Sequence, residues 1–266
     1  MITVYNNGNN FLKENSSFLD ENRYMSTFFY MDAPLIAEAN KTNYILKASD
    51  GEKQLLAIKL QPYNLILYGY KDCLGELLSF IRDNDYELEG VICPEELGEY
   101  LINISKDVLN KEFYKQIGMD FMKTTEYTEE SSSEVEIPTL EDVDELFECE
   151  GNFYKDCGLT DQPNRDNLLK KIPSLRIIRR DNKIAAMCGS SPDTDQSIRI
   201  SLVYTRSEYR EQGLARKVVN YVKNEILSRG KIATLNVDQA NPISNHLYSS
   251  LGFKKVFSQG IYLIKE

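Results

Sequence analysis

The sequence contains no tryptophan and only one histidine, His246, among its 266 residues. Its five cysteines include no C-x-x-C pair and leave an odd number, which excludes a full disulfide framework and the usual cysteine and histidine zinc sites. We therefore predict no metal site and five reduced, mostly buried thiols: Cys73, Cys93, Cys149, Cys157 and Cys188.

Long hydrophobic runs and an excess of basic residues are also missing. No apolar run approaches the roughly 18 to 20 residues of a membrane span, and the first residues form no basic and apolar leader. The formal net charge of -10 argues against nucleic acid as a general partner, because phosphate binding needs a basic face. With 42% hydrophobic residues the chain can bury a sizeable core. We expect a soluble, cytoplasmic protein without a membrane or nucleic-acid partner, and no pattern specifies its oligomeric state.

Two domains are expected, because 266 residues exceed the usual size of one compact domain. Residues 1–132 hold 12 basic and 22 acidic side chains, whereas residues 133–266 hold 19 of each. The acidic, serine-rich stretch around Ser131 is too poor in apolar residues to lie in a core. We predict an acidic N-terminal domain over 1–127, a linker over 128–134 and a C-terminal domain over 135–266.

The N-terminal half has the pattern of a mixed α and β domain. Scattered apolar positions indicate one or two helices between Phe11 and Ala39. Alternating or apolar runs predict strands over 44–48, 55–60, 65–68 and 88–93, with Asp50-Gly51 as a turn. Helices are predicted over 72–82 and from Pro94 onward.

The C-terminal half predicts a similar set of elements. Thr139 is the expected N-cap of a helix that runs to about residue 147, and a second helix covers 165–171. Strands are predicted over 134–137, 175–180, 184–188, 198–204, 232–237, 253–257 and 261–264, with a turn at Asp181-Asn182. Further helices run from Gly213 to Gly230 and from Asn241 to Gly252. The expected fold class is α/β with an α+β mixed sheet, and the shared order of elements hints at a duplication.

The segment from Val203 to Lys217 joins a predicted strand directly to a predicted helix. The first N–H groups of a helix have no partner within the helix and carry partial positive charge, so this junction suits a phosphate. Gly213 allows an anion to approach the backbone, and Ala215 leaves the first turn unobstructed. Arg216 and Lys217 lie where the helix dipole disfavours cations, a conflict that a bound polyanion would resolve. The alternative is that these side chains simply point to solvent.

These residues resemble the GNAT superfamily of acyl-CoA-dependent N-acyltransferases. Residues 210–215, REQGLA, meet the family signature [RQ]-x-x-G-x-[GA], and a tyrosine-containing strand end precedes them as in the family. A second motif-like stretch over 241–253 ends in Leu251-Gly252-Phe253. The resemblance covers residues 133–266. The N-terminal half matches neither motif, so as a GNAT-like unit it would be degenerate and would have lost the coenzyme site.

The resemblance implies a GNAT-like acyl-CoA N-acyltransferase fold in two tandem domains, with acetyl-CoA as co-substrate. Two parallel strands, 198–204 and 232–237, would splay around the pantetheine arm. The main chain of Val203, Tyr204 and Thr205 would bond the pantetheine amides, Asn241 would bond the coenzyme arm, and Tyr248 would lie near the sulfur. The coenzyme-binding residues of the loop would be Arg210, Glu211, Gln212, Gly213, Leu214, Ala215 and Arg216.

The implied activity is transfer of an acetyl or similar acyl group to a primary amine by direct attack in a ternary complex. The acceptor would be a small molecule or a peptide. The strand near Val203 would donate an N–H to the tetrahedral oxyanion. Tyr248 would act as general acid toward the departing thiolate, and a tyrosine packed on the sheet is the structural alternative.

The sequence does not single out one residue as the general base. The strand 198–203 lacks the acid that many family members place there, which leaves Glu148, Glu150 and Asp156 as candidates. His246 is expected to be exposed, because it points away from Tyr248 on the same helix. The missing strand acid also leaves open an acyl-CoA-binding sensor or partner-binding module without turnover, and a purely structural tandem domain.

Overall fold

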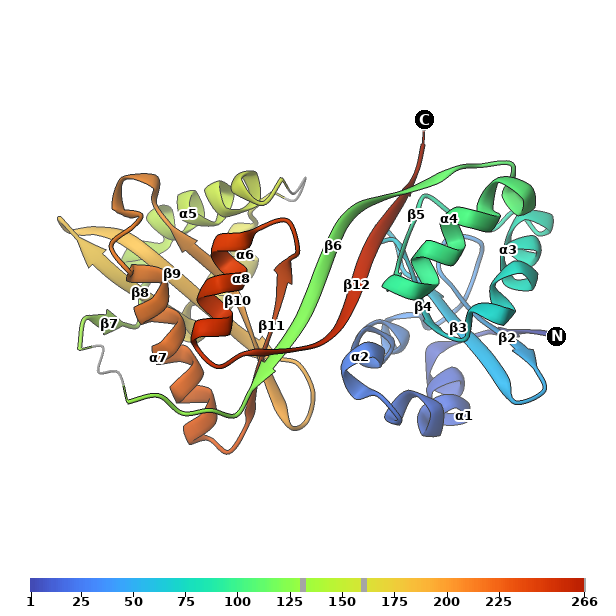
Figure 1. Cartoon of the computed structure of the whole chain (residues 1–266), viewed down its shortest axis with the longest axis horizontal. Helices are drawn as coiled ribbons and strands as arrows, with labels where there is room; N and C mark the ends of the chain where they lie inside the picture. Colours follow the sequence, from blue (N-terminus) through green and yellow to red (C-terminus); the bar gives the residue numbers. More distant parts are fainter. Residues whose placement is uncertain (130–132, 159–161, 266) are drawn as a thin grey trace. The chain divides into compact units, whose positions relative to one another are not determined.

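A computed structural model describes residues 1–129, 133–158 and 162–265 (Figure 1). These residues group into two compact units. Unit 1 comprises Met1–Asp120, Asp238–Ala240 and the residues from Phe257 onward, and unit 2 comprises Phe121–Val237 and Asn241–Val256. The units differ from the expected ranges 1–127 and 135–266, because the C-terminal segment lies in unit 1 and not in unit 2.

The N-terminal half carries a strand, two helices, three strands, a helix, a strand, a helix and a strand. These elements are β1 (Ile2–Tyr5), α1 (Gly8–Asp20), α2 (Arg23–Asp32), β2 (Tyr44–Asp50), β3 (Lys53–Lys59), β4 (Leu65–Gly69), α3 (Leu74–Asp83), β5 (Gly90–Pro94), α4 (Glu95–Leu109) and β6 (Phe113–Thr124).

The C-terminal half repeats that order without a change. Its elements are β7 (Val135–Glu136), α5 (Val143–Asp156), α6 (Arg165–Lys171), β8 (Leu175–Arg180), β9 (Lys183–Pro192), β10 (Ser197–Thr205), α7 (Leu214–Ser228), β11 (Ile232–Asp238), α8 (Pro242–Ser250) and β12 (Lys254–Ile264). The two halves are therefore structural repeats, as the sequence pattern suggested.

The last strands of the two repeats are exchanged. In unit 1 the strands follow the order β1-β2-β3-β4-β5-β12-β6, and in unit 2 the order β12-β6-β11-β10-β9-β8-β7. Residues 259–263 of β12 pair antiparallel with residues 90–94 of β5. Within the N-terminal repeat alone, the strand beside β5 would be β6. Both β6 and β12 run from one unit into the other.

The predicted strands differ from the structure in two respects. The expected strands 253–257 and 261–264 form one continuous strand, because Gln259 and Gly260 between them are extended and pair with Pro94 and Cys93 of β5. The strands β1 and β6 were not predicted. Within β6 the sequence FYKQIGMDFMKT mixes polar and apolar residues without a regular period, so alternation does not reveal it.

Unit 2 is a sheet with helices on both faces. On one face α7 and α8 cover a core that includes Val218, Val222, Leu235 and Tyr248. On the other face α5 and α6 cover Ile177, Met187, Leu202 and Tyr204, among others. Residues on successive positions of a strand point to opposite faces, so this alternation decides which side chains can meet on each side of the sheet.

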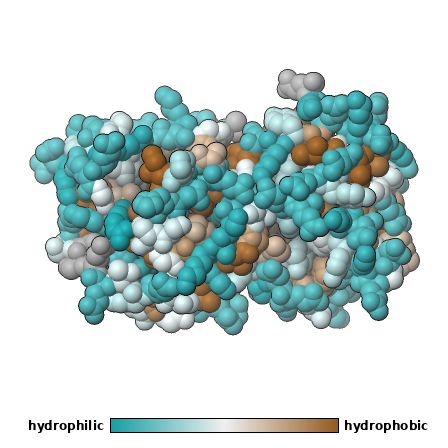
Figure 2. Space-filling view, in the orientation of Figure 1, coloured by the Kyte–Doolittle hydropathy of each residue, from teal (hydrophilic) through white to brown (hydrophobic). Residues whose placement is uncertain are grey.

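Unit 1 is built in the same way. One face of its sheet packs against α1 and α2 through Phe11, Leu19 and Phe29, and the other packs against α3 and α4. Hydrophilic side chains cover most of the surface seen in Figure 2, and apolar groups there form small patches. Four cysteines are buried and Cys157 is exposed.

Local sequence signals explain several element ends in unit 2. Thr139 and Asp142 form a reciprocal capping box at the start of the segment that leads into α5. Asp181 and Asn182 both have positive φ, +51° and +61°, which is the geometry of a type I′ hairpin turn between β8 and β9. Both local signals are confirmed, but the helix that follows Thr139 ends at Asp156 and not at about residue 147 as expected.

The described residues of the expected linker are fixed to unit 2. The main chain of Thr128 exchanges two hydrogen bonds with the side chain of Asn224 on α7, at 2.7 and 3.3 Å. Glu134 pairs with Lys217 and Arg180. Residues 130–132 of the predicted linker lie outside the described residues. The stretch 128–134 therefore does not mark the boundary between the two units.

Candidate functional site

The strands β10 and β11 are parallel neighbours that pair over a short length only. Their paired residues are 197–199 with 232–234, and the pairing stops there. The C-terminal halves of both strands are therefore free of each other, as the resemblance implied. A buried cluster closes the paired end: Asp193 accepts hydrogen bonds from Thr234 at 2.7 Å and from Arg199.

A bulge interrupts β10 where the two strands stop pairing. Ser201 lies opposite Gly189 of β9 and Tyr204 lies opposite Met187, so Leu202 and Val203 together face one residue. Leu202 has a φ of +50°, a left-handed conformation that is uncommon for a side chain of this kind. Such strain is found where the surrounding structure fixes a functional backbone shape. The bulge lies directly before the main-chain groups predicted to bind a coenzyme.

The helix α7 begins with an uncapped turn at the end of the loop after β10. Gly213 is its N-cap residue, has a φ of +72°, and has no side chain that could bond the first amides. Arg210 and the two residues after it are exposed, whereas Leu214 is buried in the core. Leu214 can therefore offer only its main chain to a ligand.

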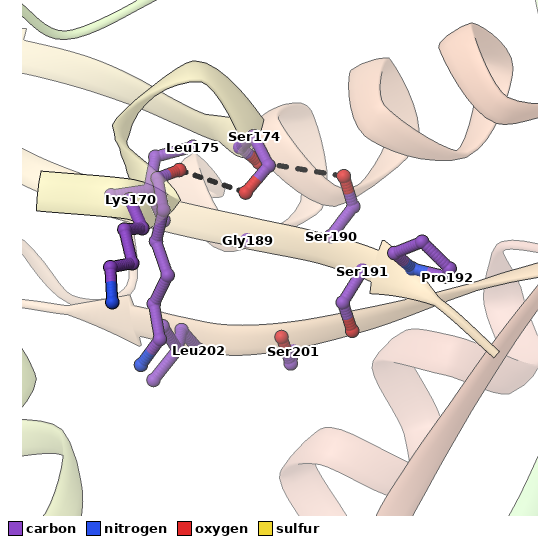
Figure 3. Close-up of a pocket in the computed structure, with 10 residues that line it drawn as sticks. Lys170, Ser174, Leu175, Gly189, Ser190, Ser191, Pro192, Ser201 and Leu202 are labelled. Carbon is purple, nitrogen blue, oxygen red and sulfur yellow. Dashed lines mark hydrogen bonds between the residues drawn. The ribbon is translucent and has the colours of Figure 1, made fainter. Parts of the chain in front are cut away.

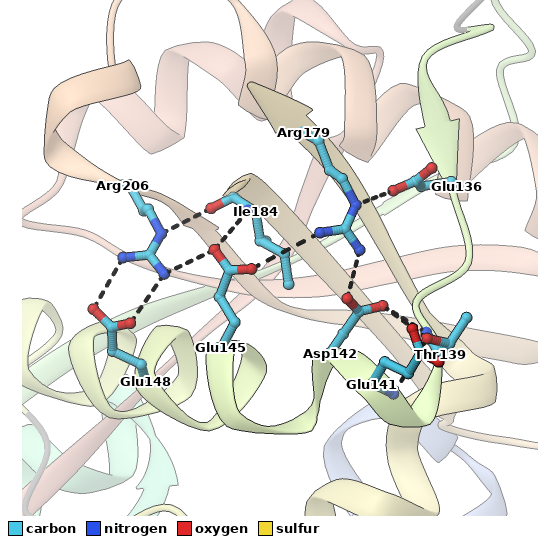
Figure 4. Close-up of polar contacts among 9 residues, drawn as sticks. All are labelled: Glu136, Thr139, Glu141, Asp142, Glu145, Glu148, Arg179, Ile184 and Arg206. Carbon is cyan, nitrogen blue, oxygen red and sulfur yellow. Dashed lines mark hydrogen bonds and ion pairs between the residues drawn. The ribbon is translucent and has the colours of Figure 1, made fainter. Parts of the chain in front are cut away.

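Arg206 holds the start of this loop in place (Figure 4). Its main-chain N–H donates to Ala185 at 2.9 Å, and its guanidinium donates to the carbonyl of Ile184 at 2.8 Å. Two further bonds of 3.0 and 3.1 Å join it to both oxygens of Glu148 on α5. Glu145 completes the cluster by accepting from Arg206 at 3.2 Å and from the Ile184 amide at 2.7 Å.

The basic side chains around the loop all have partners. Arg210 bonds the carbonyl of Thr205 at 3.2 Å and pairs with Asp156 at 2.5 Å. Arg216 donates to Ser250 of α8 at 2.7 Å, and Lys217 pairs with Glu134. These contacts fasten the loop and α7 to neighbouring elements, and the ion pairs neutralise Arg210 and Lys217 without a bound anion.

The start of α8 and its buried tyrosine lie in unit 2 with the loop. The side chain of Asn241 caps the helix by accepting from the Ser244 amide at 3.0 Å. Tyr248 is 7% exposed and packs edge-on against Phe253. Burial raises the pKa of Tyr248 well above its ordinary value, so its hydroxyl keeps its proton at neutral pH. His246 is exposed, as its place on the helix indicated.

The three candidate bases differ in their surroundings. Glu148 and Asp156 are both paired with arginines, and the bond from Arg206 holds the pKa of Glu148 below its usual value. Glu150 is 1% exposed and accepts from Lys171 at 2.7 Å and from Tyr154 at 2.8 Å through one oxygen. Its other oxygen, Oε2, is buried and has no partner in the described part of the chain.

A pocket of about 570 Å³ lies beside the bulge, on the face of the sheet covered by α6 (Figure 3). Its walls come from the end of α6, the start of β8, the end of β9 and the bulge of β10. The lining residues are Lys170, Lys171, Ser174, Leu175, Gly189, Ser190, Ser191, Pro192, Ser201 and Leu202. No pattern in the sequence predicted this pocket, because its residues come from four separate segments.

The equivalent junction in unit 1 has a different electrostatic character. The strands β4 and β5 also pair over a short length only, 65–66 with 91–92. However, Asp72 lies just before α3 and Glu76 lies in its first turn, where a phosphate would have to approach. The negative charges of these carboxylates would repel an anion, so phosphate binding at the start of α3 is unfavourable.

In the described ranges, no three or more histidine, cysteine, aspartate or glutamate side chains form a group that could hold a metal ion. No helix within those ranges is long and apolar enough to cross a membrane.

Comparison with known proteins agrees with this geometry. Residues 177–261 match the family model of FR47-like proteins. A search of curated protein sequences found no match. Among solved structures, the fold is similar to a GNAT-family acetyltransferase from Colwellia psychrerythraea, with a TM-score of 0.61, 12% identity and all of both chains covered.

Two further structures show the same likeness. A GCN5-related N-acetyltransferase from Sphaerobacter thermophilus gives a TM-score of 0.59 at 15% identity, covering 85% of this chain and 81% of the other. A tandem GNAT protein of clavulanic acid biosynthesis gives 0.57 at 8% identity, covering 100% of this chain and 98% of the other. The chain thus has the tandem fold of GNAT acetyltransferases, and its C-terminal region matches the FR47-like family.

Proposed function

We propose that the protein is an N-acetyltransferase that moves an acetyl or similar acyl group from acyl-CoA to a primary amine. The observation that carries this proposal is the end of β10: a strained bulge, a strand that leaves its parallel neighbour, and an uncapped helix start at Gly213. The GNAT fold and the match over residues 177–261 support the same assignment.

The strand residues after the bulge would hold the pantetheine arm through their main-chain groups. Val203, Tyr204 and Thr205 lie in the part of β10 that does not pair with β11. The Oγ1 atom of Thr205 is buried and has no hydrogen-bond partner in the described part of the chain. A buried hydroxyl without a partner costs free energy unless a ligand or water satisfies it, so this atom fits a site for a polar group.

The loop from Arg210 to Arg216 would bind the pyrophosphate of the coenzyme. Its amides at the start of α7 have no side-chain cap, and the helix dipole favours an anion there. Asn241 uses its Oδ1 to cap α8, so it would offer its amide N–H groups to the coenzyme arm.

In the reaction, the neutral amine attacks the thioester carbon, a C–N bond forms and the C–S bond breaks with its electron pair passing to sulfur. The amide of Val203 in the bulge is the fixed donor for the oxyanion. The amine loses a proton to a base or to water, and the thiolate gains one. Holding both reactants in one ternary complex supplies much of the acceleration.

Tyr248 would donate a hydrogen bond to the departing sulfur. Its raised pKa keeps the hydroxyl protonated, which a donor requires, but makes complete transfer of its proton to a thiolate less favourable. Among the candidate bases, Glu150 alone has a buried oxygen without a partner, so it is the best placed to accept a proton, through water.

A second candidate function is an acyl-CoA-binding sensor without turnover. It is favoured by one observation: Glu148 and Asp156 are both engaged with arginines and β10 carries no acid. Acyl-CoA binding without transfer to any amine, and without an effect of Tyr248→Phe on slow thioester hydrolysis, would support the sensor.

The test is calorimetric titration with acetyl-CoA and with CoA of the wild-type protein and of two matched variants. Gly213 and Gly230 lie at the two ends of α7, have φ values of +72° and +70°, and have open space where a Cβ would lie. Replacement by aspartate therefore strains both sites equally. We expect Gly213→Asp to abolish binding and Gly230→Asp to preserve it. No binding by the folded wild-type protein would overturn the proposal.

A further inference from the structure

The pocket beside the bulge has a cationic end. Lys170 and Lys171 lie on the last turn of α6 and both line the pocket. The ammonium group of Lys171 is neutralised by Glu150, which does not itself line the pocket. Lys170 forms no ion pair among the described residues, so this end of the pocket carries an excess positive charge.

The opposite part of the pocket offers hydroxyl groups without partners. Ser174 and Ser190 use their hydroxyls to bond main-chain carbonyls, at 2.8 and 3.4 Å. The hydroxyls of Ser191 and Ser201 form no hydrogen bond within the described ranges. Figure 3 shows them on the far side of the pocket from the Lys170 side chain. Ser201 borders the bulge, so this end of the pocket adjoins the proposed site of acyl transfer.

A buried amide oxygen on the neighbouring strand belongs to a side chain that faces the same side of the sheet. Leu235 and Val237 of β11 belong to the core under α7 and α8, so Asn236 between them faces the opposite side. Counting two residues on from the pair Arg199 and Thr234 places Asn236 level with Ser201, where the strands have already parted. The Oδ1 atom of Asn236 is buried and has no partner in the described part of the chain.

We propose that this pocket is the acceptor site and that the acceptor is a primary amine carrying an anionic group, such as a carboxylate. This inference rests on the proposed function. Lys170 binds the anionic group, with Lys171 beside it, and the Oδ1 atom of Asn236 accepts an N–H of the amine near the bulge. The volume of about 570 Å³ is that of a site for a small metabolite.

The probes are two pairs of amines that differ in charge. The first pair is β-alanine and its carboxamide, and the second is O-phosphoethanolamine and ethanolamine. Thiol release from acetyl-CoA is measured for each, with rates expressed per concentration of neutral amine because the paired probes differ in basicity. We expect kcat/KM to be at least about tenfold higher for the charged member of a pair. A preference within the β-alanine pair would indicate a carboxylate acceptor, and a preference within the phosphoethanolamine pair would indicate a phosphate acceptor.

Three variants separate the roles of the residues. Lys170→Gln should lower kcat/KM about tenfold for charged amines and leave uncharged amines unchanged. Lys183→Gln is its control, because Lys183 is an exposed lysine at the opposite end of the β8–β9 hairpin and its loss changes the net charge equally. Asn236→Val should lower kcat/KM for charged and uncharged amines alike, without raising the Kd for acetyl-CoA.

Equal kcat/KM for the members of both pairs, or no effect of Lys170→Gln on either charged probe, would overturn the proposal. So would complete absence of turnover together with no calorimetric binding of the charged probes to the CoA-saturated protein. A higher Kd for acetyl-CoA in Asn236→Val would show that Asn236 contributes to coenzyme binding instead. Failure of the proposed function is recognised separately, because the wild-type protein would then not bind acetyl-CoA at all.

Discussion

Arg206 and Glu148 form a two-pronged ion pair in which each nitrogen of the guanidinium end bonds a different carboxylate oxygen, at 3.0 and 3.1 Å. The pair joins α5 to the residue that follows β10. It therefore links one covering helix to the loop that we assign to phosphate binding.

Arg206→Gln should destabilise unit 2 by about 2–4 kcal/mol, because the change removes the partner of two carboxylates and of the Ile184 carbonyl. Urea unfolding measures the loss. The control is Arg229→Gln, which removes an exposed ion pair with Glu225 and should cost less than about 0.5 kcal/mol. Equal costs in the two variants would show that the Arg206 cluster contributes nothing beyond a surface contact.

Acid should weaken the same cluster. The bond from Arg206 lowers the pKa of Glu148 in the folded protein, so the unfolded chain binds more protons in the window between the two values. The contribution of this pair is complete above about pH 4.3, the ordinary glutamate value, and is lost as the pH falls through the folded pKa. Because 59% of the Glu148 side chain is exposed, the effect should stay below about 1 kcal/mol.

The pH effect is measured by urea unfolding of the wild type and of Glu148→Gln between neutral and acid pH. The variant should lose less stability on acidification than the wild type. A variant with the same or a steeper loss would mean that other carboxylates, such as Glu134 beside Lys217 and Arg180, dominate acid unfolding.

Tyr248→Phe should lower kcat about 100-fold with little change in the KM for acetyl-CoA, because it removes only the hydroxyl that we propose as the donor to the departing thiolate. Thiol release at saturating acetyl-CoA checks this. Tyr221→Phe on the exposed side of α7 is the matched control and should leave kcat unchanged. An unchanged kcat in Tyr248→Phe would leave the residue as a packing tyrosine against Phe253.

Removal of the residues from Phe257 onward should unfold unit 1, although these residues are the farthest in sequence from its first strand. The deletion takes away the partner of β5 and the ring of Tyr262, which is fully buried in the core under α4. Hydrogen exchange of β5 and α4 is the measurement. Tyr262→Phe is the control, since it keeps the ring and loses only a hydroxyl bonded at 3.4 Å. Retained protection of β5 in the shortened chain would show that β6 can take the place of β12.

The sequence predicted most helices and the hairpins because their signals are local. The cap at Thr139, the turn at Asp181-Asn182 and the four-residue spacing along α7 each act within one element. The mixed fold followed from the order of these elements, and the loop at Gly213 from a short motif. Such features need no knowledge of which segments meet in space.

Other features depend on contacts between distant segments, and no local sequence pattern predicts them. The strain at Leu202 occurs at a leucine, where a glycine or asparagine would have signalled a left-handed backbone. Asn236 lies between two apolar residues of an ordinary strand, and its unpaired oxygen follows only from the parting of β10 and β11. The exchange of β6 and β12 likewise depends on which distant strands pair with each other, and the pattern within one strand does not specify this.

That exchange constrains the order in which parts of the chain can fold. During synthesis the N-terminal half emerges before β12, the strand that lies beside β5 on the side opposite β4. Pairs so distant along the chain give the topology a high contact order, which slows folding. Until β12 emerges, the β5 edge of a nascent N-terminal half lacks its partner in the folded protein, and such an edge is a template for unwanted pairing.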